Sequence, residues 1–275
     1  MADKAKESGA LRFLYHTVPG RIILRVLIAR WVSKLCGAFL SSRLSKPLIG
    51  KFVKNNGINL DEFESDNFTC FNDCFCRKIK EDGRPIPQDE SIFFSPCDGL
   101  LSAYRIQTDT ILPIKQSAYT LSSLLQDDAL AEQYRDGTCL VFRLCVNHYH
   151  RYCYPATGVK GENHFIKGKL HTVRPIALES CPVFSENCRE YTVIDTDRFG
   201  KLVQMEVGAM LVGKIRNHHG AGPVARGDEK GMFLYGGSTI ILLLEKDAVA
   251  IRDDFFTATD NGDETPIRMG ESLIM

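Results

Sequence analysis

The sequence lacks the features of a protein that crosses a membrane or leaves the cell. In its basic N-terminal part, the apolar stretch 21–40 is interrupted by Arg25, Arg30 and Lys34. Each such cation costs roughly 2.5 to 3.5 kcal/mol at the centre of a bilayer, which argues against a spanning helix. No cleavable signal is expected either, because charged residues crowd the first seven positions and no A-x-A site follows the apolar stretch.

Other absences exclude further classes of protein. The chain has no internal repeat, no low-complexity segment and no nucleotide-binding loop. Its ten cysteines are scattered, which predicts free thiols in a reducing compartment rather than a disulfide framework. The C-x3-C-x-C spacing of "CFNDCFC" (70–76) is not a usual zinc pattern, and no second cluster completes it. We expect no metal there, but a short helix that packs through Phe71, Phe75 and Arg77.

Length and charge indicate a globular chain with a basic front. The 275 residues are 44% hydrophobic and 25% charged, enough to bury a sizeable core as one large or two small domains. Residues 1–56 hold eleven Lys and Arg against Asp3 and Glu7, which leaves +9 there and −9 in the rest of a chain of zero net charge. Such a segment suits nucleic acid or an anionic membrane surface.

The apolar pattern of the basic segment favours the membrane surface and no nucleic-acid partner. At 100° per residue, one face of a helix over 21–40 collects Leu24, Leu27, Ile28, Trp31, Leu35 and Ala38. This helix is either an interfacial anchor built on Trp31 or a helix docked on its own core, and one face could serve both. A second helix is predicted at "SKPLIGKFVKNNG", beginning near Pro47.

The texture of the sequence changes near residue 81. Helical periodicity dominates before it, and the turn-rich "DGRPIPQDE" leads into short alternating or β-branched runs. We predict an α+β protein, with N-terminal helices over 1–81 that associate with the membrane and a mainly antiparallel β-rich domain over 82–275. One helix is expected within 115–135, capped by Thr120 or Ser122. The predicted strands lie in "SIFFSP", "CLVFRLCV", "EYTVID", "LVQMEVGAMLVGKI", "GSTIILLLEK" and "AVAIRDD".

The stretch "LYGGSTIILLL" (234–244) places two glycines and a Ser-Thr pair before a buried strand. One interpretation is a glycine turn before an edge. The other is that Gly237 lets the Ser238 hydroxyl reach the preceding carbonyl carbon, which favours cleavage of the backbone. Three further stretches combine reactive polar groups with glycines: "SPCDG" (95–99), "NHYHRYCYPATG" (147–158) and "QMEVGAMLVGKI" (204–215).

Taken together in this order, these motifs resemble the phosphatidylserine decarboxylase family, pyruvoyl enzymes that make phosphatidylethanolamine. The family's S-P-x-D-G is present at 95–99, and its D-Y-H-R-type motif appears as "HYHR" (148–151). Its V-G-A-x-x-V-G is "VGAMLVG" (207–213), and its K-G-x-E-x-G-x-F-x-x-G-S-T tail appears as "EKGMFLYGGST" (229–239). The resemblance runs over most of the chain.

The resemblance implies a proenzyme that cuts itself between Gly237 and Ser238. The Ser238 hydroxyl would attack the Gly237 carbonyl, and elimination followed by loss of ammonia would leave a covalent pyruvoyl group on fragment 238–275. This fragment and fragment 1–237 would form a heterodimer. The pyruvoyl carbonyl would act as the electron sink for decarboxylating phosphatidylserine. We expect the protein to form a homo-oligomer. We also expect it to be a peripheral protein on the cytoplasmic face of an anionic membrane, which in a bacterium is the inner membrane.

The resemblance also implies roles for Asp98 and a histidine beside Ser238. The family's Y-H-R-x-H carries the processing histidine at its second position, where this chain has Cys153. His150 matches the first histidine, which serves the decarboxylation step. The base for Ser238 is therefore His171 in "KLHTVRP", His150 in a double role, or Cys153 if it were a thiolate.

The remaining polar candidates have weaker patterns. Arg226 and Lys230, in a glycine-rich loop, are expected to contact the lipid phosphate. Glu206 is expected to face solvent, and His218 and His219 to lie in a mobile loop at the site mouth.

Two alternatives stay open beside the decarboxylase. A serine hydrolase could use Ser238, His150 and Asp98, although the G-x-S-x-G elbow is absent and the serine opens a strand. An unprocessed, non-enzymatic phospholipid-binding homologue could use the same scaffold.

Overall fold

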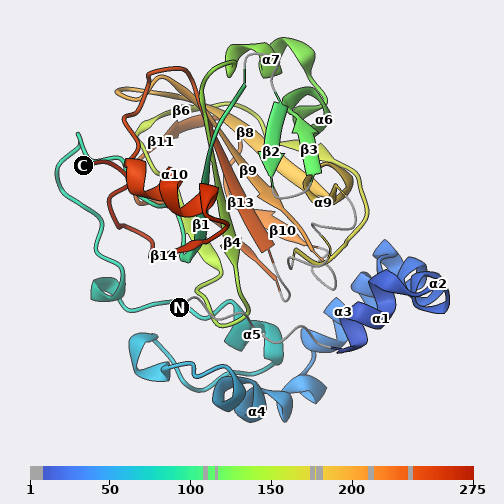
Figure 1. Cartoon of the computed structure of the whole chain (residues 1–275). Coiled ribbons are helices and arrows are strands. Elements are labelled where there is room, and N and C mark those ends of the chain that lie inside the picture. Colours follow the sequence, from blue (N-terminus) through green and yellow to red (C-terminus); the bar gives the residue numbers. More distant parts are fainter. Residues whose placement is uncertain are drawn as a thin grey trace.

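The computed structural model describes residues 9–107, 111–114, 117–173, 177, 182–209, 214–234 and 238–275. Its centre is one nine-stranded antiparallel sheet (Figure 1). The strands of this sheet are β1 (Gly99–Arg105), β4 (Thr138–Leu144), β6 (Gly158–Lys160), β7 (His164–Ile166), β8 (Arg189–Thr196), β9 (Lys201–Val207), β11 (Gly222–Val224), β13 (Ser238–Leu244) and β14 (Thr265–Ile267). They run in the order β11-β6-β8-β9-β13-β4-β1-β14, and β7 pairs with β8 off this path.

Strand β13 is buried on both faces of the sheet. Successive side chains of a strand point to opposite faces. Ile241 and Leu243 join one core cluster, while Ile240, Leu242 and Leu244 join another. We call the first side the helix-covered face and the second the sheet-covered face. Burial on both sides explains why the sequence shows an unbroken apolar run here instead of an alternating one.

Different layers cover the two faces of the central sheet. The helix-covered face packs against a hairpin and short helices: β2 (Ile111–Ile114), β3 (Ser117–Thr120), α6 (Leu121–Leu125), α7 (Asp128–Gln133) and α9 (Val183–Glu186). The sheet-covered face packs against a three-stranded sheet and a C-terminal helix: β5 (Arg151–Cys153), β10 (Ile215–Asn217), β12 (Glu229–Phe233) and α10 (Asp253–Asp260).

The N-terminal helices stand beside and below this core (Figure 1). They are α1 (Gly9–His16), α2 (Val18–Leu27), α3 (Arg30–Leu40), α4 (Leu48–Asn55) and α5 (Phe71–Phe75). We call α1 to α3 the helical arm. The α+β class with helices first is confirmed, as are α4, next to Pro47, and the short packed helix α5.

The single helix expected over 21–40 is wrong. Ala29 takes an extended conformation (ψ 137°), which ends α2 and begins α3. The predicted apolar face is divided accordingly. Leu24 and Ile28 are buried with the helix-covered core, whereas Trp31 and Leu35 are 59% and 63% exposed.

Three further expectations need correction. Thr120 does cap α6, but the expected helix is split, since 117–120 is strand β3 and α7 is separate. "SIFFSP" and "AVAIRDD" contain only the isolated bridges of Phe94 with Ser272 and Ile251 with Ile274, because these runs pair with the C-terminal segment. No helix in the described ranges is long and apolar enough to cross a membrane.

Candidate active site

Ser238 and Asp98 lie at the same end of the central sheet. Ser238 is the first residue of β13 and pairs with Leu144, the last residue of β4. On the other side of β4, Arg143 pairs with Leu100 of β1, directly after Asp98 and Gly99. Antiparallel pairing therefore brings "SPCDG" and the Ser-Thr pair to the same end of three adjacent strands. Gly237, the other half of the expected cleavage point, lies outside the described residues.

The Ser238 hydroxyl is buried in the core. Its side chain is fully inaccessible, and its Oγ has no hydrogen-bond partner among the described residues. Since Ile240 two residues later lies in the sheet-covered core, Ser238 faces the same side. An unpaired buried hydroxyl costs roughly 1 to 3 kcal/mol, so its position calls for an explanation.

The carboxylate of Asp98 is already fully engaged. Arg84 donates from Nε to Oδ1 at 2.7 Å and from Nη2 to Oδ2 at 2.6 Å, and the Met269 amide donates to Oδ1 at 3.0 Å. The bidentate pair fixes the orientation of the carboxylate. No hydrogen bond joins it to a histidine in the described part of the chain, and the imidazole that its charge reaches is that of His148.

His150 has the form of a free base. Its Nδ1 lies 2.9 Å from the His148 carbonyl, so Nδ1 carries the proton, and the buried Nε2 has no partner in the described ranges. The ring lies 4.0 Å from that of Phe75. Burial and then the nearby Arg77 cation hold the pKa of His150 well below its usual range. The imidazole is therefore neutral, with its lone pair on Nε2.

His150 lies at the Ser238 end of the sheet. It follows Leu144 by six residues, and its carbonyl accepts a hydrogen bond from Phe233, five residues before Ser238, at 3.0 Å. Ser238, Asp98 and His150 thus all lie toward one end of the central strands.

His148 has the opposite tautomer. Its Nδ1 accepts a hydrogen bond from the Cys145 amide at 3.1 Å, which leaves the proton of the neutral ring on Nε2. Burial lowers the pKa of His148, although the Asp98 charge opposes the shift. His148 is therefore suited to donate a proton or a hydrogen bond rather than to accept one.

Cys153, at the position of the family's second histidine, is a buried thiol. Its amide donates to the Pro96 carbonyl at 2.9 Å, and its Sγ lies 3.5 Å from the same oxygen. Burial raises the pKa of Cys153 far above its usual range, so the thiolate needed for a base is disfavoured.

His171 reaches the same end of the sheet as Ser238, since Asn187 donates both to its carbonyl and to that of Gly208, but it lies on the other face. Its Nδ1 lies 3.3 Å from the Tyr15 hydroxyl of α1, and its Nε2 lies 3.5 Å from a carboxylate oxygen of Glu186. Tyr15 and the neighbouring Val173 belong to the helix-covered core. Ser238 faces the opposite side of the sheet, so His171 links the helical arm to the core instead.

Lys230 and Glu206 form a buried ion pair. The Lys230 Nζ lies 2.6 Å from each Glu206 carboxylate oxygen, and both side chains are fully inaccessible. The expectations that Glu206 faces solvent and that Lys230 lies in a loop are corrected: they occupy β9 and β12, whose side chains meet under the sheet-covered face. Asn217 donates to Glu206 at 3.0 Å and completes the cluster.

The other loop candidates have structural partners. Arg226 donates to the carbonyls of Asp89 and Ile92 at 2.6 and 2.9 Å. His218 lies 2.8 Å from Glu229, and His219 Nδ1 lies 3.2 Å from the Tyr154 hydroxyl. No group of three potential metal ligands occurs among the residues described.

Sequence reasoning missed three site residues. Arg84, Arg77 and His148 were in quoted stretches but were given no role in the chemistry. The "HYHR" motif pointed at His148, because a histidine replaces the family's aspartate there. Nothing in the sequence marks Arg84 as the partner of Asp98.

Comparison with known proteins agrees with the geometry. The family model described as "Phosphatidylserine decarboxylase" matches residues 71–275. A "Phosphatidylserine decarboxylase proenzyme 2" of Clostridium acetobutylicum is 42% identical over 272 residues, 98% of this chain and 93% of that protein. Proteins named "Phosphatidylserine decarboxylase proenzyme" from Clostridium kluyveri and Clostridium botulinum are 40% and 38% identical, covering 96% and 98% of this chain and 91% and 94% of theirs.

Proposed function

Because the chain belongs to the phosphatidylserine decarboxylase family, we propose that it converts phosphatidylserine to phosphatidylethanolamine and CO2 after cutting its own backbone before Ser238. The observation that carries the self-cleavage is the buried Ser238 hydroxyl without a partner. A hydroxyl kept unpaired in a core is available to attack, whereas a structural serine would bond to a nearby carbonyl.

In the cleavage step, His150 acts as the base. Its Nε2 lone pair accepts the Ser238 proton as Oγ attacks the carbonyl carbon of residue 237. The proton then passes to the Ser238 nitrogen as the bond between this nitrogen and the carbonyl carbon breaks, which leaves an ester on Oγ for the later elimination. The His148 carbonyl holds the other nitrogen in place. Asp98, fixed by Arg84, acts on His150 and Ser238 through the charge that it places near His148. It makes no direct contact with His150. His171 and Cys153 have no part in the proton transfer.

The residues at this sheet edge also fit a pyruvoyl group derived from Ser238. Such a group supplies an electrophilic carbonyl that accepts the electrons released when CO2 leaves. The chain's own contribution is a water-poor enclosure, made by Phe75 and Leu144, and a movable proton. Once protonated at Nε2, His150 can return a proton to the substrate carbon.

The two fragments stay together as a heterodimer after the cut. Strand β13 belongs to fragment 238–275, and it pairs with β4 over seven residues and with β9 over six. Both neighbours belong to fragment 1–237, so the ladder hydrogen bonds and the apolar core hold the cut chain in the sheet.

The helical arm associates with an anionic membrane surface, on the cytoplasmic face of a bacterial inner membrane, without spanning it. Ten of the thirteen exposed large apolar side chains in the described part lie at positions 13–48: Phe13, Val18, Ile22, Ile23, Val26, Trp31, Leu35, Phe39, Leu44 and Leu48. Every charged residue between positions 9 and 56 is Lys or Arg. An apolar surface with only cations beside it suits anionic lipid.

Intact mass spectrometry of the purified protein tests the proposal. The wild type should give fragments 1–237 and 238–275, the smaller with a pyruvoyl mass at its N-terminus, and should release labelled CO2 from phosphatidylserine. Ser238→Ala should stay intact. Ser33→Ala removes another buried, unpartnered hydroxyl, in α3, and should split like the wild type.

Two outcomes would overturn the proposal. An intact wild-type chain that reacts with a serine-directed phosphonate would be a hydrolase. An intact chain that binds lipid and does neither would be a non-enzymatic homologue.

A further inference from the structure

Arg77 is a buried cation without a bonded carboxylate. Its side chain is 3% exposed and lies over the Phe63 ring, with Cζ 4.4 Å from the centroid. Its hydrogen bonds within the described chain go to the backbone carbonyls of Cys74, Asn147 and His148, at 3.3, 3.0 and 3.3 Å. The Asp98 charge acts on Arg77 without bonding to it. A buried charge without a bonded counter-charge is costly, so this arrangement calls for a role beyond packing.

Two of the three carbonyls that Arg77 bonds, those of Asn147 and His148, belong to the turn that carries His150. The His148 oxygen accepts from Arg77 Nη2 and also from His150 Nδ1, at 2.9 Å. This second bond decides which nitrogen of the His150 ring keeps its lone pair. Two residues before Arg77, Phe75 packs against the same ring at 4.0 Å.

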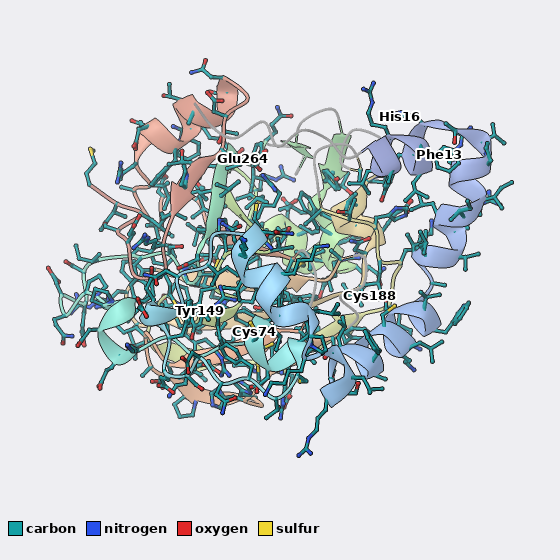
Figure 2. All side chains as sticks on the ribbon, turned by 90° about the horizontal axis from the view of Figure 1, so that it is seen from below. Phe13, His16, Cys74, Tyr149, Cys188 and Glu264 are labelled. Carbon is teal, nitrogen blue, oxygen red and sulfur yellow. The ribbon has the colours of Figure 1, made fainter. Side chains whose placement is uncertain are left out.

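The two segments meet below the ends of the strands, as the molecule is drawn in Figure 1. Figure 2, which is seen from below, labels Cys74 and Tyr149 near one another and well away from Phe13 and His16 in the helical arm. Arg77 bonds to the carbonyl of Cys74 on one side and to the turn that leads into Tyr149 on the other. Residues 75–77 therefore touch both the His150 ring and the carbonyl that orients it.

We propose that Arg77 is a positioning residue for His150, because it fixes the carbonyl that keeps the Nε2 lone pair of this imidazole free. The proposal rests on the proposed function of His150 as the base for Ser238. Arg77 also disfavours a second positive charge beside it, so its presence keeps the His150 ring neutral, with the Nε2 lone pair unprotonated.

The charged and titratable groups around His150 support this second effect. Burial lowers the pKa of His150 most, followed by the Arg77 charge, and His148 acts in the same direction. Arg151 is paired with Glu229 at 2.8 Å. Cys76 stays a neutral thiol, because burial raises its pKa to about 12. Asp98 is held by Arg84 and reaches His148 instead.

Two substitutions separate orientation from charge. Arg77→Lys keeps the cation but loses the forked donor, whereas Arg77→Met loses both. The measurement is the rate of splitting of freshly synthesised full-length proenzyme, followed by gel from pH 5 to pH 9. We expect both variants to split at least about tenfold more slowly than the wild type. The acid limb of the rate should move to higher pH in Arg77→Met alone, because only there does the imidazole become easier to protonate.

Arg189→Met is the matched control. Arg189 is also buried and, within the described chain, bonds only to backbone carbonyls, among them those of Leu124 and Ser185. Its guanidinium lies on the α6 and α9 side of the sheet. Its loss should reduce thermal stability as much as the loss of Arg77, without moving the pH limb.

A second measurement covers variants that fold poorly. In the Ser238→Ala proenzyme, nitrogen NMR of labelled histidines should show His150 in the Nδ1–H tautomer, and adding Arg77→Lys should mix the two tautomers. Wild-type rates and pH limbs in both Arg77 variants, or an unchanged tautomer, would overturn the proposal. If instead Ser238→Ala still splits, the proposed function fails first, which the same gels reveal separately.

Discussion

The helical arm and the Ser238 end of the sheet break the ordinary rule of burial in opposite directions. The arm leaves large apolar side chains in water, with Leu35 63% exposed. The sheet end places polar atoms in the core that have no partner among the described residues, among them Ser238 Oγ and His150 Nε2. Neither arrangement stabilises the isolated chain, since one forgoes burial of apolar area and the other forgoes hydrogen bonds.

The difference teaches which kind of partner each region awaits. An apolar surface beside cations is completed by something outside the protein that is both apolar and anionic, as a membrane is. A polar atom sealed in the core cannot be completed from outside, so its use has to be chemical and internal. On the proposed function, the arm therefore locates the protein at a membrane surface, and the Ser238 end of the sheet carries out the reaction.

The largest expected effect comes from replacing His150. His150 and His171 are both buried, but His171 lies beside Tyr15 and Glu186 on the other face of the sheet from Ser238, whereas His150 follows β4 at the Ser238 end. His150→Gln should slow self-cleavage by roughly 10²- to 10⁴-fold, the usual contribution of a general base. His171→Gln should leave the cleavage rate within about threefold of the wild type, a range set by ordinary context effects on packing. Time courses of fragment formation measure both.

The opposite ranking of these two variants would break the comparison. If His171→Gln abolished cleavage and His150→Gln did not, the face of the sheet on which each histidine lies would be the wrong guide to the base. The histidine under the arm would then be the base, and the arm would have to move for the chain to mature.

The next effect concerns the buried pair of Lys230 and Glu206. In the uncut Ser238→Ala background, Lys230→Met should lower the free energy of unfolding by about 3 to 5 kcal/mol, because it leaves a buried carboxylate alone. Replacing both residues, as Lys230→Met with Glu206→Leu, should restore most of that loss. Urea unfolding measures each value.

The same double variant, with Ser238 kept, tests Lys230 as a lipid contact. If Lys230 only balances Glu206, the KM for phosphatidylserine should stay near that of the wild type. A large rise in KM with restored stability would show that Lys230 reaches the phosphate, and would join this cluster to the substrate site.

These regions differ also in how far the sequence predicts them. The apolar run of β13, the helix at Pro47 and the short helix around Phe75 follow from local patterns, and motif resemblance pointed to Ser238, Asp98 and His150. Local patterns did not predict the break at Ala29, which divides one apolar arc between core and surface.

The missed contacts are long-range ones. Arg77 bonds to the carbonyl of His148, 71 residues away, and Arg84 bonds to Asp98 across a turn-rich segment. Periodicity carries no information about such partners, because tertiary packing brings them together. Placing His171 on the other face of the sheet from Ser238 likewise needed the tertiary structure, because only the packing of β13 shows which face Ser238 occupies.

A smaller effect is expected when the arm is made polar. Trp31→Ser with Leu35→Ser removes two exposed apolar side chains, and should weaken binding to vesicles containing phosphatidylglycerol by about 2 kcal/mol, roughly 30-fold. Val159→Ser with Phe165→Ser changes side chains that are 60% and 48% exposed on β6 and β7. This control should bind as the wild type does. Sedimentation with vesicles measures both, and equal loss in the two pairs would remove the arm as the membrane surface.

The smallest effect is a pH dependence of stability, and it separates the buried histidines from the exposed one in the arm. Burial lowers the pKa of His148, His150 and His171 in the folded chain. Below the unfolded value of about 6.5, the unfolded chain binds more protons than the folded one, so stability is full above that pH and falls as the solution becomes more acidic.

Each histidine that stays neutral contributes a slope of about 1.4 kcal/mol per pH unit over that acidic range. His150→Gln in the Ser238→Ala background should therefore remove about one such slope between pH 6.5 and pH 5, and urea unfolding at several pH values measures it. His16→Gln, in the exposed end of α1, is the control for the loss of a histidine from the surface. If His150→Gln kept the full slope, His150 would be protonated in the folded chain, and the free Nε2 lone pair on which the cleavage step depends would not exist.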